Sequence, residues 1–264
     1  MTGYYEPELR GSRTCDSRLK VPVYGRPDDL ISSLPESERA RVNDRVTGFR
    51  ATPRGDVSYY TRAEIDAGAL AGRGLEILYV EDVVELFYMQ VQGSGLVRLE
   101  DGKSIRLVYA GKNGHPYTSI ARSLMMRNQL AADEIDMDTV KAWLRADAIR
   151  GHALMRENAS YVFFREAEGL EGPLGAEGVP LTPGRSLAID TAYHALGTPV
   201  FVSSIGLRGP GGLPFRRLMI AQDVGSAIAG PQRGDIFFGT GDKAGSIAGR
   251  TRHTAEFHIL VPKR

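Results

Sequence analysis

The sequence has a single cysteine, Cys15, so it can form no intramolecular disulfide and offers no set of thiolates for a zinc site. It contains no apolar run of the roughly 18 residues that a membrane-spanning helix needs. The formal net charge is only +1, which gives no indication of nucleic acid as a partner. The five histidines show no H-E-x-x-H spacing. We therefore predict neither a metal ion nor another cofactor.

The start of the chain also lacks the basic, apolar and small-residue pattern of an export signal. It opens on Met1–Tyr5, which resembles the interior of a strand. We therefore expect that the start is truncated or misplaced, and that an export signal has been lost upstream. The 264 residues suffice for one large domain or two modest ones.

What the sequence does have is glycine and proline, at 31 and 14 residues, which favours many turns and short strands. Up to Arg165, strand-like segments alternate with helical patterns. After Arg165, short β-rich segments separated by Gly and Pro indicate a small barrel. These segments are Leu187–Asp190, Val200–Val202, Leu218–Gln222, Asp235–Gly239 and Glu256–Val261. The change in composition predicts a domain boundary near residue 165.

Local signals predict individual elements in the first part of the chain. Thr61 and Glu64 have capping-box spacing, which predicts a helix to about Leu70. Asp101-Gly102 predicts a hairpin. Further helices are expected at Ser119–Arg127, at Thr139–Ala148 with Asp138 as its N-cap, and at His152–Glu157. Ile77–Tyr88 fits a strand or a helix, and Arg26–Asp56 a surface loop with one short helix.

For three short motifs, a purely structural role stands beside a functional one. Gly239–Gly245 fits neither the dinucleotide fingerprint nor the P-loop and is predicted to be a turn-rich barrel loop. Gln92–Gly95 lacks the G-x-S-x-G pattern of a serine hydrolase. Lys112–His115 is either a turn or a group of binding side chains, and Tyr4 is either a core residue or a platform for a sugar ring.

The carboxylates carry the chemistry that we expect. A glycosidase usually needs two, and 32 Asp and Glu residues offer too many pairs to choose from. Asp235 is distinctive because it begins the apolar strand Gly234–Phe238. Apolar surroundings raise the pKa of a carboxyl group, which can then act as a general acid. Asp223 could serve beside it, or could equally cap a short helix.

Taken together, several stretches resemble the membrane-bound lytic transglycosylase A family. The matching segments run in the same order over nearly the whole chain: Thr2–Tyr5, Ser58–Leu70, Val91–Gly95, Tyr109–His115, Asn158–Phe164, Val179–Thr182, Asp223–Ile228, Gly234–Phe237 and Ala244–Gly249. Each segment alone is weak evidence, whereas the set is specific.

The resemblance implies a mainly β fold: a double-psi β-barrel, similar to barwin and the expansins, with a second β-rich domain containing a few helices inserted in it. The barrel would comprise residues 1–6 and 166–264, without its N-terminal part, and the insert residues 7–165. A groove between them would hold the glycan. The family's catalytic acid falls on Asp235. The substrate-binding residues that we expect are Thr2, Tyr4, Gln92, Gly93, Ser94, Lys112, Asn113, Asp223, Gly225 and Asp242.

The implied activity is cleavage of the β-1,4 bond between N-acetylmuramic acid and N-acetylglucosamine in peptidoglycan, with formation of 1,6-anhydromuramic ends. Glycan strands would be the partner of a monomer in the periplasm or at the outer membrane of a Gram-negative bacterium. A lipid anchor would belong to the full-length protein and not to this chain. Three alternatives stay open: a water-using muramidase with Asp235 and Asp223, a non-catalytic expansin-like wall-binding module, or a folded chain that its missing start leaves inactive.

Overall fold

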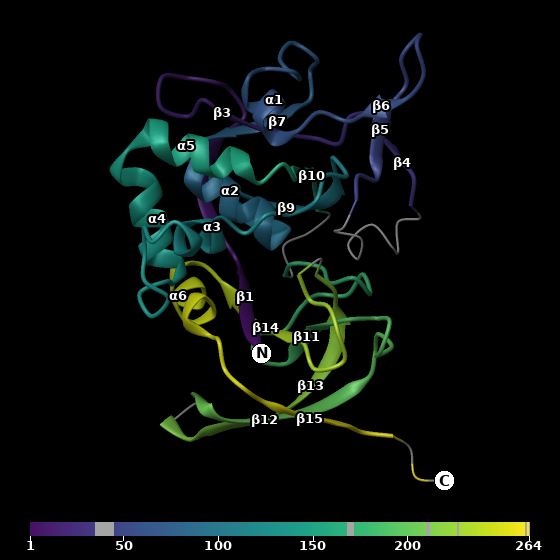
Figure 1. The fold of residues 1–264 in the computed structure, drawn as a ribbon, viewed down its shortest axis with the longest axis vertical. Coiled ribbons are helices and arrows are strands. Elements are labelled where there is room, and N and C mark those ends of the chain that lie inside the picture. The colour runs from purple at the N-terminus through teal and green to yellow at the C-terminus, as the bar shows by residue number, and fades with distance from the viewer. Residues whose placement is uncertain (35–44, 168–171, 210–211, 226, 262, 264) are drawn as a thin grey trace. The chain divides into compact units, whose positions relative to one another are not determined.

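The computed structural model describes residues 1–34, 45–167, 172–209, 212–225, 227–261 and 263. It divides the chain into two compact units, each described by itself (Figure 1). Unit 1 consists of Met1–Glu6 and Leu170–Arg264, and unit 2 of Pro7–Gly169. The predicted mainly β architecture with a few helices is confirmed. The roles of residues 1–6 and 166–264 as catalytic barrel and of residues 7–165 as substrate-groove insert stay predictions.

Unit 1 is built on a six-stranded sheet with the order β1-β14-β11-β13-β12-β15. The strands are β1 (Thr2–Glu6), β11 (Ser186–Ile189), β12 (Pro199–Arg208), β13 (Pro214–Asp223), β14 (Gly234–Thr240) and β15 (Glu256–Ile259). β1 pairs with β14 in parallel and β11 pairs with β13 in parallel, whereas the other pairs are antiparallel. One face of this sheet carries an apolar core that includes Leu187, Val202, Met219 and Ile236.

Helix α6 (Asp242–Arg250) lies beside β1 and β14 in unit 1 (Figure 1). The prediction of a turn-rich loop over Gly239–Gly245 is therefore wrong from Asp242 onward. Gly241 is the N-cap of the helix, with φ of 85°. Gly245 lies inside the helix. A Cβ atom at this position would be 2.7 Å from the nearest atom of the Tyr5 ring, so only glycine fits there. The glycine thus allows close packing and does not mark a turn.

Unit 2 contains a second six-stranded sheet, in the order β10-β9-β8-β2-β7-β3, and a small sheet β4-β5-β6. The strands are β2 (Glu8–Ser12), β3 (Val21–Tyr24), β4 (Ile31–Ser32), β5 (Gly48–Arg50), β6 (Val57–Ser58), β7 (Glu76–Val80), β8 (Ser94–Leu99), β9 (Ser104–Lys112) and β10 (Val162–Glu166). Leu78, Val97, Leu107 and Phe164 belong to its main apolar core. Residues 35–44 of the polar region predicted as a loop with one helix lie outside the described residues.

The helices of unit 2 begin at side-chain caps. Thr61 and Glu64 form the predicted capping box, and α1 (Arg62–Asp66) follows it. This helix ends before Leu70 because Gly68 adopts φ of 100°. Three of the other helices are α3 (Ile120–Met126), α4 (Met137–Ala146) and α5 (Ala148–Glu157). The N-cap of α4 is Asp136 and not the predicted Asp138, since Thr139 N donates to Asp136 Oδ1 over 2.8 Å.

The stretch Ile77–Tyr88 holds both a strand and a helix. β7 ends at Val80, and α2 (Val83–Gln92) begins after Asp82, whose Oδ1 accepts a hydrogen bond from Val84 N over 2.7 Å. An apolar run that fits both periods is thus divided by one capping carboxylate. The predicted hairpin at Asp101-Gly102 is confirmed as β8 and β9. Among the described residues, none of the helices is long and apolar enough to cross a membrane.

Candidate active site

A row of four residues crosses the sheet of unit 1 and contains both acids predicted from the sequence. Asp235 on β14 lies opposite Thr2 on β1 and opposite Ala188 on β11. Ala188 in turn lies opposite Asp223 on β13. Because neighbouring strands are about 4.8 Å apart, the Cα atoms of the two acids are roughly 10 Å apart. Their side chains share the face opposite the apolar core, with only the small side chain of Ala188 between them.

A β-bulge brings Asp223 to this face. Leu187 pairs with Ala221, but the next residue, Ala188, pairs with Asp223, so Gln222 is the extra residue. Without the bulge, the alternation of the strand would turn the Asp223 side chain toward the apolar core. The alternative reading of Asp223 as a helix N-cap is wrong: it ends β13, and no helix follows it among residues 224–225 and 227–228, Ser226 lying outside the described residues.

The Asp235 carboxyl group is only partly paired. The Thr2 hydroxyl bonds to it, and Arg233 lies close enough to act on its charge. Arg233 Nη2 also donates to Thr2 Oγ1 over 3.5 Å. Asp235 Oδ1, however, is buried and has no hydrogen-bond partner. Burial raises the pKa of Asp235 to about 6, against the lowering effects of Thr2 and Arg233, while the nearby Asp223 adds to the rise. A carboxyl group with this pKa stays protonated in a larger share of molecules near neutral pH than an ordinary carboxyl group does.

The Asp223 carboxyl group is fully engaged. Its Oδ2 accepts a hydrogen bond from the Tyr4 hydroxyl over 2.8 Å, and its Oδ1 accepts from Ala176 N over 3.1 Å and Val224 N over 2.9 Å. Burial raises the pKa of Asp223 to about 6 against these three stabilising bonds. The ring of Tyr4 packs on Phe237, with 5.3 Å between the centroids. Tyr4 is thus a packed residue whose hydroxyl belongs to the site.

Two further residues of unit 1, Gly225 and Asp242, were predicted from the sequence to bind substrate. Gly225 follows Asp223 by two positions and packs against Ile228, whereas Asp242 begins α6 beyond the other end of β14 and is exposed. The sequence reasoning missed Ala188 and Arg233. Arg233 could have been found from its position two residues before Asp235, but the place of Ala188 follows only from strand register.

The other predicted residues belong to unit 2. Gln92, Gly93 and Ser94 form the turn from α2 to β8, where Gly93 is the C-cap with φ of 84°. Lys112 ends β9, and burial lowers the pKa of its ammonium group.

Asn113 anchors the backbone of unit 2. Its exposed fraction is 0%, so a ligand has no access to it in this structure. Its Nδ2 donates to Tyr60 O over 2.8 Å and to Ala159 O over 2.9 Å. Its Oδ1 accepts from Tyr161 N over 2.9 Å and from His115 N over 3.3 Å. Of the two readings of Lys112–His115, the structural one therefore describes Asn113.

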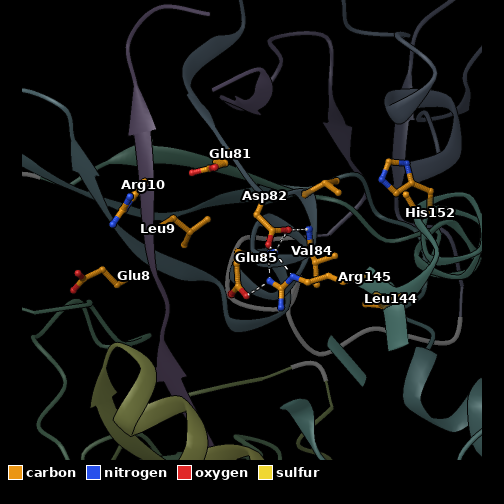
Figure 2. A pocket seen from close by; sticks show the side chains of 12 residues that line it. Glu8, Leu9, Arg10, Glu81, Asp82, Val84, Glu85, Leu144, Arg145 and His152 are labelled. Carbon is orange, nitrogen blue, oxygen red and sulfur yellow. Dashed lines mark hydrogen bonds and ion pairs between the residues drawn. The ribbon is translucent and has the colours of Figure 1, made fainter. Parts of the chain in front are cut away.

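Unit 2 also contains an open pocket with a volume of about 550 Å³ near the N-terminus of α2 (Figure 2). Figure 2 shows Asp82, Glu85 and Arg145 linked to one another, so these three charges already neutralise each other in part. Gln92–Ser94 lie at the other end of α2, which is roughly 15 Å long. None of the site residues predicted from the sequence lines this pocket.

The raised pKa of Asp235 predicts how the stability of unit 1 depends on pH. Because this pKa rises from 3.8 to about 6 on folding, the unfolded chain ionises first, and folding free energy is lost as pH rises through this window. Asp235→Asn should therefore raise the melting temperature at about pH 7.5 and change it little at about pH 4. Thermal melts of both proteins at the two pH values test this. An equal change at both would contradict the pKa.

Most of the chain matches two family models. Residues 1–165 match the family model of the MltA specific insert domain, and residues 185–261 match that of the 3D domain. Membrane-bound lytic murein transglycosylase A of Vibrio cholerae is 33% identical over 258 residues, which are 96% of this chain and 62% of that protein. The chain thus spans less than two thirds of this relative's length.

Solved structures extend the agreement to the fold. The crystal structure of a membrane-bound lytic murein transglycosylase from Agrobacterium tumefaciens is 40% identical and has a TM-score of 0.90, covering 99% of this chain and 73% of that one. Escherichia coli MltA with bound chitohexaose is 30% identical with a TM-score of 0.79, covering 98% and 70%. The predicted fold class, a double-psi β-barrel with a β-rich insert, is confirmed. This chain belongs to the membrane-bound lytic murein transglycosylase A family.

Proposed function

We propose that this chain is a lytic transglycosylase that cleaves peptidoglycan glycan strands with Asp235 as its single acid and base. The observation that carries the proposal is the Asp235 carboxyl group, which has a pKa of about 6 and a buried oxygen, Oδ1, without a partner. Such a group can hold a proton at neutral pH and present it to a substrate oxygen. The chitohexaose bound to the Escherichia coli relative supports a glycan ligand.

In the first step, protonated Asp235 donates its proton to the glycosidic oxygen between N-acetylmuramic acid and N-acetylglucosamine. The bond from the muramic C1 to that oxygen breaks, and the sugar ring develops oxocarbenium character. In molecules in which Asp223 is ionised and Asp235 is protonated, the negative charge of Asp223 favours this step in two ways. It raises the pKa of Asp235, and it can stabilise the positive charge on the ring.

In the second step, the Asp235 carboxylate takes the proton from the C6 hydroxyl of the same muramic residue. The C6 oxygen attacks C1 and closes the 1,6-anhydro ring, and Asp235 is again protonated. Because this nucleophile is tethered to the substrate, no second carboxylate is needed to activate water. The hydrogen bond of Thr2 to Asp235 can orient the carboxyl group through both steps.

A water-using muramidase is the second candidate, because an inverting glycosidase works with two carboxyl groups and both acids lie in one row of the sheet. Such an enzyme would need Asp223 as a free base for water. Both oxygens of Asp223 instead accept hydrogen bonds, from Tyr4 and from two backbone N–H groups. This engagement favours the transglycosylase.

The products of isolated peptidoglycan, analysed by mass spectrometry, test the proposal. We expect anhydromuropeptides, each lighter by one water than the hydrolysis product. Reducing ends would instead identify a muramidase. Sedimentation with the wall but no soluble product would identify an expansin-like binding module.

We further propose that unit 2 acts as the substrate-binding insert, with Gln92–Ser94 and Lys112 in contact with glycan. The enzyme would act as a monomer in the cell envelope of a Gram-negative bacterium, in the periplasm or at the outer membrane. The name "membrane-bound" of its relatives supports this location.

A further inference from the structure

The bulge that aims Asp223 is held by a buried side-chain hydrogen bond. Ser186 begins β11 and has an exposed fraction of 0%. Its Oγ donates to Gln222 Oε1 over 2.6 Å and accepts from Thr182 N over 2.8 Å. Gln222 is the extra residue of the bulge. β11, which pairs with the bulged strand, therefore also holds the side chain of Gln222.

The carbonyl group of Gln222 is held from another side. Glu177 N donates to Gln222 O over 3.3 Å. Gly175 lies so close that a Cβ atom there would be 2.3 Å from the same oxygen. Ala176, between these two residues, donates its N–H to Asp223 Oδ1. The segment Gly175–Glu177 thus packs against the bulge at Gln222 and donates a hydrogen bond to Asp223.

We propose that Ser186 and Gln222 are positioning residues for the reaction: their hydrogen bond fixes the β-bulge that places the Asp223 carboxyl group on the same face as Asp235. Neither residue needs to touch the substrate. The inference rests on the proposed transglycosylase function for its kinetic consequences, but its structural part stands on the register and contacts of β11 and β13.

The alternative register shows why the bulge needs to be fixed. If Gln222 paired with Ala188, the Asp223 carboxyl group would point toward Leu187 and Ile236 in the apolar core, where burial of an unpaired carboxylate is unfavourable. Loss of the Ser186–Gln222 bond should therefore loosen the end of β13 without flipping it. Asp223 would then act less strongly on Asp235.

The kinetic consequence follows from the charges around the two acids. The groups that face them are Thr2 and Tyr4 on β1, Arg233 just before β14, the amino group of Met1, and the N–H groups of Ala176 and Val224. Among these charged neighbours of Asp235, Asp223 raises its pKa, whereas Arg233 and the amino group of Met1 lower it. When Asp223 is displaced, the pKa of Asp235 should fall, so that the general acid loses its proton at lower pH.

Two variants break the bond, and one keeps it. Ser186→Ala removes the donor, Gln222→Met removes the acceptor at similar length, and Ser186→Thr retains the hydroxyl. In both bond-breaking variants we expect the alkaline limb of the profile of kcat/KM against pH, measured by anhydromuropeptide release, to move down by about half a pH unit or more. Ser186→Thr should keep the limb of the wild type.

Asp223→Asn supplies the matched background. It should move the limb in the same direction, and adding Ser186→Ala to it should produce no further movement, because both changes act through one carboxylate. A uniform fall in rate at every pH without a shift would overturn the proposal, since a merely structural role predicts that result. So would an additional shift in the Asp223→Asn background.

A carboxyl-carbon NMR titration of Asp235 separates this proposal from the proposed function. If the wild type released no anhydro products, the function would fail, yet the titration would still decide the positioning role. A lower Asp235 pKa in Ser186→Ala and Gln222→Met supports it, and unchanged values overturn it. Should Ser186→Ala not fold, Gln222→Met and Ser186→Thr carry the same comparison.

Discussion

Asp235→Asn is expected to abolish the release of anhydromuropeptides, with a loss in kcat of about 10⁴-fold or more. General acid and general base catalysis each contribute about 10²- to 10⁴-fold, and one carboxyl group performs both in the proposed mechanism. The amide has nearly the shape of the protonated acid but cannot donate a proton to a leaving oxygen or accept one from the C6 hydroxyl. Product release from isolated peptidoglycan, followed by mass spectrometry, measures the effect.

The control must show that the loss is chemical. Glu256→Gln removes an exposed carboxylate from β15 of the same sheet and should leave the rate unchanged. Asp235→Asn should also melt no lower than the wild type at neutral pH, because burial disfavours the charge that it removes. Cleavage retained by the Asp235→Asn protein at a comparable rate would rule out Asp235 as the catalytic acid.

The second large effect concerns stability. Asn113→Ala should lower the free energy of unfolding of unit 2 by about 4 kcal/mol, at about 1 kcal/mol for each backbone group left without its bond. Those groups are Tyr60 O, Ala159 O, Tyr161 N and His115 N. For a unit of this size the melting temperature should fall by roughly 8–16 °C. The sole tryptophan, Trp143, lies in unit 2 and reports its unfolding by fluorescence.

Asn158→Ala is the matched comparison. Asn158 is also buried, but its side-chain oxygen accepts two backbone hydrogen bonds, from Thr118 N over 3.1 Å and from Ser160 N over 3.3 Å. Its loss should therefore cost about half as much, or about 2 kcal/mol. If the two variants were equally destabilised, the number of backbone groups served by each amide would not explain their contributions.

Local signals in the sequence predicted those elements whose causes are local. The capping box at Thr61 and the Asp101-Gly102 hairpin depend on residues within a few positions, and both are present. Helix α6 was not predicted, because the glycines of Gly239–Gly245 are typical of a turn. Gly245 instead leaves room for the ring of Tyr5, which lies on the distant strand β1. Packing between segments far apart in sequence leaves no such local mark.

The active-site row was only partly predictable for the same reason. Asp235 was found from its place at the start of an apolar strand and from the family resemblance. That Ala188 separates it from Asp223 depends on the registers of β11 with both β13 and β14. Simple alternation would turn Asp223 toward the apolar core, and the bulge at Gln222 turns it to the opposite face. The residues around Gln222 contain no signal that predicts this bulge.

The discontinuity of unit 1 has a consequence for biosynthesis. Thr2, which contacts the Asp235 carboxyl group, is 231 positions from Arg233 along the chain, yet the two residues are hydrogen-bonded. A ribosome releases the whole of Pro7–Gly169 before β14 exists. Unit 2 can therefore fold while β1 still waits for its partner, and closing so long a loop is slow. The Asp235 carboxyl group should therefore gain its contact with Thr2 only after the whole of unit 2 has been synthesised.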